Sequence, residues 1–213
     1  GSGTFLKSEL EPVDSPAARD LAARAMSYSP ERPLYVVAIG AITNIASALL
    51  MNPAIVDNMV VVWLGGNAVD WPDAREFNLS QDVAAARVVY NSGVPLVLLP
   101  CMGVVSALTT TGPELAYWLS GKNALCDYLV RQTVNEAESY AKGKVWSRVI
   151  WDVAAIAWLL NDEGSLLRNR LIPTPIPEYD DHYAHDPTRP LCKYVYHISR
   201  HALLADLFQK IGV

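Results

Sequence analysis

The sequence predicts an α/β fold with an open, mostly parallel, Rossmann-like sheet flanked by helices, followed by a mainly helical C-terminal part. Three short apolar runs rich in β-branched residues, 33–40, 59–66 and 94–100, read as strands buried on both faces. Helical patterns over 43–52 and 80–93 separate these runs. Strand and helix therefore alternate with short connections, which is typical of βαβ units.

The rest of the chain extends this plan. Pro16 directly after Ser15 predicts the start of a helix that runs to about residue 28. The segment 112–161 has three helical patterns, and the Pro-rich segment 173–190 predicts an irregular or extended excursion. The last residues, 191–212, predict a strand followed by a helix. No repeat or linker interrupts the pattern, so we expect one domain over residues 1–213.

Composition narrows the class of protein. Hydrophobic residues make up 51% and charged residues 18% of the chain, which excludes a disordered protein. The net charge of −5, with no block of Lys and Arg, argues against a nucleic-acid partner. No apolar run reaches the roughly 18 residues of a membrane span. Three cysteines without CxxC spacing, Cys101, Cys126 and Cys192, predict reduced thiols in a cytoplasmic protein.

Ligands of open α/β sheets bind beyond the carboxyl ends of the strands, which directs attention to the loops 38–44, 64–78 and 100–106. In the second loop, Glu76 and Asn78 have the spacing that puts both side chains on one side of an extended segment, with Phe77 on the other. A carboxylate and an amide suit a polyol such as ribose. The alternative is that Asn78 or Ser80 merely caps the following helix.

Two further positions have a functional and a structural interpretation. Asp152 interrupts an apolar helix start after Trp151. It either caps that helix or binds a hard metal, with the ring of Trp151 beside it as a surface for stacking. At the turn 38–44, exposed carbonyls could bind calcium, or Thr43 or Asn44 could simply cap a helix. No Gly-rich phosphate loop is present.

The histidines are weaker candidates. His197 and His201 have the spacing of one helix face, but no third metal ligand accompanies them. His182 and His185 lie in the acidic, aromatic stretch "YDDHYAHD", which predicts a solvated surface loop.

Taken in order, these loops resemble the inosine-uridine preferring nucleoside hydrolase family. The resemblance rests on "AIGAITNIASALLMNPAIVDNMVVVWLGG", then "REFNLSQDVAAARVVYNSGVPLVLLP", and later "WDVAAIAWLL". It implies hydrolysis of the N-glycosidic bond of a ribonucleoside by a calcium-bound water. It also implies a small-molecule nucleoside as partner and a homo-oligomer, a dimer or tetramer.

The resemblance assigns roles to residues by position. Asp152 matches a late aspartate that binds the metal and the ribose, and Ala38 matches a residue whose carbonyl binds calcium. Glu76 matches a ligand of the 5′-hydroxyl and Asn78 a ligand of a ring-side hydroxyl, with Phe77 between them. Asn67 matches a family asparagine that binds the 5′-hydroxyl. Leu64 matches a position that lies beneath the sugar.

The chain departs from the family pattern at two places. Trp151 stands where many pyrimidine-accepting members have a histidine that acts as leaving-group acid, which predicts a purine preference through stacking. The family's DxDxxxDD metal cluster has no counterpart in the sequence, so we expect a chain that lacks the first βα units of the fold. Two alternatives follow: a catalytically inactive nucleoside- or ribose-binding module, or an α/β scaffold without a small-molecule site.

Overall fold

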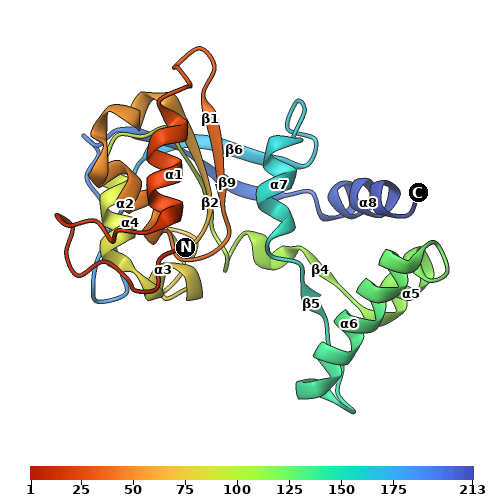
Figure 1. Cartoon of the computed structure of the whole chain (residues 1–213). Helices are drawn as coiled ribbons and strands as arrows, with labels where there is room; N and C mark the ends of the chain where they lie inside the picture. Colours follow the sequence, from red (N-terminus) through yellow and green to blue (C-terminus); the bar gives the residue numbers. More distant parts are fainter.

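A central five-stranded sheet organises the protein in a computed structural model that describes residues 1–213 (Figure 1). The strand order is β1 (Leu34–Ala38), β2 (Met59–Leu64), β3 (Leu96–Leu99), β9 (Leu191–Ile198) and β6 (Leu167–Pro173). The first four strands are mutually parallel, and β6 pairs antiparallel with β9. The predicted mostly parallel sheet is confirmed.

Helices cover one face of the sheet and build the larger core. They are α1 (Pro16–Ala25), α2 (Thr43–Met51) and α4 (Val83–Asn91), with the 3₁₀ helix η1 (Pro53–Asn58) leading into β2. Ser15 caps α1 by accepting a hydrogen bond from the backbone N–H of Ala18, as the Ser-Pro start predicts. Trp63 of β2 is fully buried in this core, and its indole N–H donates to the carbonyl of Gly40 at 2.9 Å.

A second core lies on the opposite face. It is formed by α7 (Val153–Leu159), α8 (Arg200–Ile211) and the 3₁₀ helix η2 (Val105–Ala107), which pack on side chains such as Val62, Val97 and Val195. Figure 1 shows α7 and the start of α8 on the side of the sheet away from α1, α2 and α4. Helices on both faces explain why β2 and β3 read as continuous apolar runs.

The predicted helix over 80–93 is in fact two helices, α3 (Phe77–Gln81) and α4, separated by Asp82. The Asp82 carboxylate is buried and accepts three hydrogen bonds: from the N–H of Ala85, from the N–H of Leu6 and from the hydroxyl of Thr43. One side chain therefore caps α4 and ties the N-terminal segment and α2 to it. Thr43 consequently serves as a donor to Asp82, and α2 begins without a side-chain cap.

Two strand predictions need correction. The run 33–40 was expected to be buried on both faces, but β1 is the edge strand of the sheet and Tyr35 is 51% exposed. Strand β6 was not predicted, because its sequence "LRNRLIP" carries charged residues at an exposed edge. Its register on β9 also shifts between Arg168 and Asn169.

A helical arm extends from the sheet. It consists of α5 (Gly112–Leu119) and α6 (Ala124–Ala141), carried by the two-stranded ribbon of β4 (Thr109–Thr110) and β5 (Arg148–Val149). Figure 1 shows this arm projecting from the body, with α8 running toward it. A small cluster of Leu115, Leu119 and Cys126 joins the arm to Phe208 and Ile211 of α8. The helical part of the prediction is thus confirmed.

The Pro-rich segment contains a short hairpin of β7 (Ile176–Pro177) and β8 (Tyr183–Ala184). The strand and helix predicted over 191–212 are confirmed as β9 and α8. His197 lies in β9 and His201 in α8, so the one-helix spacing that these two could have had is not realised. All three cysteines are free and buried. No helix combines the length and the apolar character that a membrane crossing requires.

The three hydrogen bonds accepted by Asp82 lead to a prediction about stability. Asp82→Ala leaves two backbone N–H groups and one hydroxyl without their acceptor, so we expect the free energy of unfolding to fall by about 2–4 kcal/mol. Chemical denaturation measures this change. The matched control is Asp57→Ala, whose exposed side chain accepts no hydrogen bond and whose removal should change stability by less than about 0.5 kcal/mol. Equal effects of the two substitutions would contradict the assignment.

Candidate functional site

A pocket of about 530 Å³ opens at the carboxyl ends of β1, β2 and β3. This volume is within the range of small-molecule sites. The three loops chosen from the sequence meet here, together with the start of α7. The lining residues are Ile39, Leu64, Asn67, Arg75, Glu76, Phe77, Asn78, Cys101, Met102, Trp151 and Asp152. Of the residues predicted for the site, Ala38 alone is outside this lining; it is the last residue of β1 and precedes Ile39.

Glu76 is the N-cap of α3 as well as a pocket residue. Its Oε1 accepts from the N–H of Asn78 at 2.9 Å, and its Oε2 accepts from the N–H groups of Leu79 at 3.1 Å and Gly66 at 2.9 Å. The carboxylate thus joins the start of α3 to the end of β2. The helix cap expected of Asn78 or Ser80 is supplied by Glu76, and the segment is the start of a helix where an extended one was expected.

Asn78 is buried and Phe77 is exposed, although the extended segment from which this difference was expected is the start of a helix. Asn78 is buried, and its Nδ2 donates to the main-chain carbonyl of Leu64 at 2.9 Å, which leaves its Oδ1 without a protein donor. Phe77 is 79% exposed at the mouth of the pocket. Leu64 is buried at the end of β2 and lines the pocket beneath these residues.

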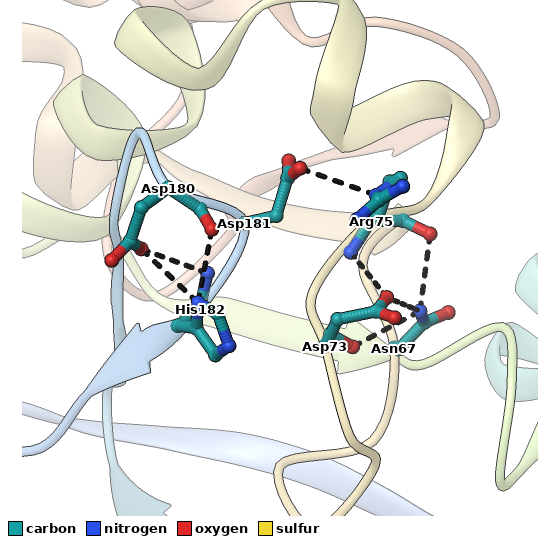
Figure 2. Close-up of polar contacts among 6 residues, drawn as sticks. All are labelled: Asn67, Asp73, Arg75, Asp180, Asp181 and His182. Carbon is teal, nitrogen blue, oxygen red and sulfur yellow. Dashed lines mark hydrogen bonds and ion pairs between the residues drawn. The ribbon is translucent and has the colours of Figure 1, made fainter.

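Asn67 uses its amide to hold the protein's own main chain. Its Nδ2 donates to the carbonyls of Asp73 and Arg75, both at 3.2 Å, and its Oδ1 accepts from the N–H of Met102 at 3.2 Å. Figure 2 shows the side chain of Asn67 turned toward Asp73 and Arg75. Asn67 therefore shapes the loop. The resemblance assigned it as a sugar ligand, but in this arrangement its amide has no free donor.

Asp152 and Trp151 come from the opposite wall. Asp152 precedes α7, but its side chain makes no cap hydrogen bond, so the structural alternative of a helix cap does not describe this residue. Its carboxylate is exposed toward the pocket, next to the half-buried ring of Trp151. The site thus presents an unpaired carboxylate beside an aromatic ring.

The donors for a calcium ion are too few among these residues. Calcium takes about six to eight oxygen ligands. The residues predicted to bind it are Asp152 and the carbonyl of Ala38, while the carbonyl of Gly40 is engaged by Trp63. No group of three or more His, Cys, Asp or Glu side chains is arranged to hold a metal. The 213 residues therefore do not complete a calcium site.

Four lining residues were not predicted from the sequence: Ile39, Arg75, Cys101 and Met102. Burial, with Glu76 beside it, raises the pKa of the Cys101 thiol, so Cys101 stays protonated at neutral pH. Arg75 forms an ion pair with Asp181 at 3.2 Å. All four lie within the strand-end loops 38–44, 64–78 and 100–106, and this placement was the available signal.

A cavity of similar size, about 560 Å³, lies between α5 and α8. Its one carboxylate, of Glu114, is paired with Arg200 at 2.5 Å, and Lys122 also lines the cavity. Burial raises the pKa of Glu114, but the hydrogen bonds from Arg200 and Thr110 outweigh it, so the pKa is lowered. The strand-end pocket is the better candidate site, because it combines the sheet-edge position with an unpaired carboxylate.

Sequence comparison gives a family match. Residues 1–191 match the family model described as inosine-uridine preferring nucleoside hydrolase. The chain is 28% identical over 152 residues to the pyrimidine-specific ribonucleoside hydrolase RihA of Citrobacter koseri, covering 68% of this chain and 48% of that protein. It is 29% identical over 171 residues to the Klebsiella pneumoniae protein of the same name, covering 76% and 54%. The chain thus spans about half the length of the curated relatives it matches.

Solved structures agree at the level of fold. A plant nucleoside hydrolase superimposes with a TM-score of 0.76 at 19% identity, over 95% of this chain and 69% of that one. A purine-preferring ribonucleoside hydrolase from Gardnerella vaginalis gives a TM-score of 0.75 at 20% identity, over 93% and 66%. The family match over most of the chain, the shared fold and the strand-end pocket lead to one conclusion. The chain belongs to the inosine-uridine preferring nucleoside hydrolase family.

Proposed function

We propose that this protein acts on ribonucleosides and hydrolyses their N-glycosidic bond to free base and ribose, and that the strand-end pocket is where sugar and base bind. The observation that carries the proposal is the convergence of Glu76, Asn78, Trp151 and Asp152, from two distant segments of the chain, on one pocket. Family membership supplies the reaction class.

In this proposal the ribose lies over Leu64. The free Oδ1 of Asn78 accepts from a ribose hydroxyl, and the remaining exposed edge of the Glu76 carboxylate meets the 5′-hydroxyl. Asn67 holds the main chain at Arg75, directly before Glu76. The base stacks on Trp151, and Phe77 stands at the open side of the pocket.

Asp152 is the proposed catalytic and metal-binding residue, because its carboxylate has no partner in the protein and stands beside the base-binding wall. We propose calcium as the metal, with the carbonyl of Ala38 as a second ligand. A calcium ion held there would supply an activated water. Because the described residues do not complete its coordination, no further step is assigned to it.

The alternative of an inactive binding module is favoured by one observation, the absence of a complete metal site. Binding and hydrolysis must therefore be measured separately. We also propose that the protein is a homo-oligomer, a dimer or tetramer, that it is located in the cytoplasm, and that residues 1–213 form a single domain.

The proposal is tested with the full chain, inosine and uridine. We expect either nucleoside to raise the melting temperature, because a ligand that binds the native state stabilises it. We also expect release of free ribose above the uncatalysed rate in the presence of calcium. Asp152→Asn should lower that release by at least about 100-fold, the loss typical of removing a preorganised charged group. Asp206→Asn in α8, where the carboxylate is half-buried, pairs with Lys210 and lies outside the pocket, is the matched control and should leave ribose release unchanged.

Each result of this experiment is decisive. Nucleoside binding without ribose release would identify an inactive binding module. Absence of both would contradict the proposed function altogether and would favour an α/β scaffold without a small-molecule site.

Trp151 should determine base preference. A purine offers more stacking area than a pyrimidine, and stacking on an aromatic side chain contributes roughly 1–3 kcal/mol per base. We therefore propose that inosine binds more tightly than uridine and that Trp151→Ala weakens inosine binding at least about fivefold. Trp118→Ala, at an exposed position in the other cavity, is the control. The names of the RihA relatives describe pyrimidine specificity, so calorimetric titration that shows tighter uridine binding would overturn the purine preference.

A further inference from the structure

The loop 65–75, between β2 and Glu76, is held by the C-terminal part of the chain at several points. Val69 donates its N–H to the hydroxyl of Tyr194 at 3.1 Å. Ala74 donates its N–H to the carbonyl of Asp181 at 2.6 Å, and Arg75 pairs with the Asp181 carboxylate. Figure 2 shows Asp181 reaching across to Arg75 from the hairpin segment. These contacts join segments more than 100 residues apart in sequence.

Tyr183 holds the beginning of the same loop. Its hydroxyl lies so close to Gly66 that a Cβ at this position would collide with it, and Gly66 also has a φ of +72°. Glycine alone tolerates both conditions. Burial raises the pKa of the Tyr183 phenol, so the group that lies against Gly66 is the neutral hydroxyl.

Asp181 holds the end of the loop through an uncommon conformation. Its φ of +68° lies in the left-handed region, which non-glycine residues rarely occupy. From this position its carbonyl meets Ala74 and its carboxylate meets Arg75, the residue before Glu76. The neighbouring residues Asp180 and His182 pair with each other instead, as Figure 2 shows.

The loop in turn places Glu76. Gly66 donates to the Glu76 carboxylate at 2.9 Å, and Asn67 ties the carbonyls of Asp73 and Arg75 together from inside the loop. A shift of Gly66 or of Arg75 would therefore move the carboxylate and the start of α3, which carries Asn78.

We propose that Asp181, Tyr183 and Tyr194 form a positioning clamp, which fixes the loop 65–75 so that Glu76 and Asn78 are held ready for the sugar of a ribonucleoside. Tyr183 is its central positioning residue. The clamp gives the Pro-rich segment a role in ligand recognition without contact to the ligand. The identity of the ligand in this proposal rests on the proposed function. The contacts that form the clamp do not depend on that function.

The experiment compares the full chain with Tyr183→Phe, which removes only the hydroxyl. Tyr179→Phe is the matched control, because Tyr179 lies in the turn of the same hairpin and its hydroxyl donates to Glu9, away from the loop. Amide hydrogen exchange is followed over residues 65–76, together with the melting temperature, the Kd of inosine and uridine, and kcat and KM wherever ribose is released.

We expect Tyr183→Phe to accelerate exchange over 65–76 by about tenfold, because the loop loses the contact of the hydroxyl with Gly66. Kd and KM should rise about fivefold while kcat stays within about twofold, since the sugar contacts act in ground state and transition state alike. A purely structural defect would instead lower kcat through a smaller folded fraction and leave KM unchanged. Tyr179→Phe removes the hydrogen bond to Glu9 and can lower the melting temperature, but it should leave exchange over 65–76, Kd, KM and kcat unchanged.

Unchanged exchange over 65–76 in Tyr183→Phe, or an equal change in Tyr179→Phe, would overturn the clamp. If the unsubstituted chain binds neither inosine nor uridine, the proposed function fails, and the exchange data still decide whether the clamp exists. If Tyr183→Phe does not fold, Asp181→Asn replaces it with the same measurements, because it weakens the partly exposed pair with Arg75 and keeps the backbone contact to Ala74.

Discussion

The site depends on the hydrogen bonds that the carboxylate of Glu76 accepts from the backbone. Three backbone N–H groups, of Gly66, Asn78 and Leu79, point at its two oxygens. Hydrogen bonds to a charged group contribute about 1.5–3 kcal/mol each, more than those between neutral groups. One side chain thereby fixes the end of a central strand to the start of a helix, and the pocket lies along that junction.

This arrangement separates the groups that build the pocket from the groups left free for a ligand. Asn67 and most of the Glu76 carboxylate are engaged by the main chain, so their positions are determined before any ligand arrives. Asp152, the Oδ1 of Asn78 and the face of Trp151 have no such partners. In the proposed function these free groups meet the sugar and the base. They contain only one carboxylate, which explains why the pocket has no complete metal site.

The sequence was informative where a local rule governs the structure. The buried strands β2 and β3 and the Ser-Pro start of α1 follow from short-range patterns, and the strand-end rule selected the loop that carries Glu76 and Asn78. The place of Asp152 in the site was implied by the family resemblance, because its local pattern is equally that of a helix start. Long-range pairing was not predictable in the same way. Strand β6 has a charged sequence because it is an edge strand, and the cap on α3 is a Glu in place of the usual Ser, Thr, Asp or Asn. The contacts of Tyr183 and Asp181 with the loop 65–75 join residues that no local pattern connects.

The most direct test of this account is the stability of Glu76→Gln. The amide of glutamine turns an N–H₂ toward backbone N–H donors, so we expect the free energy of unfolding to fall by about 2–3 kcal/mol. The amide resonance of Gly66 should also shift in an ¹⁵N-correlated spectrum. Glu138→Gln, at an exposed position of α6, should leave both unchanged. A Glu76→Gln protein as stable as the unsubstituted chain, with the Gly66 resonance in place, would show that the carboxylate does not hold the site together.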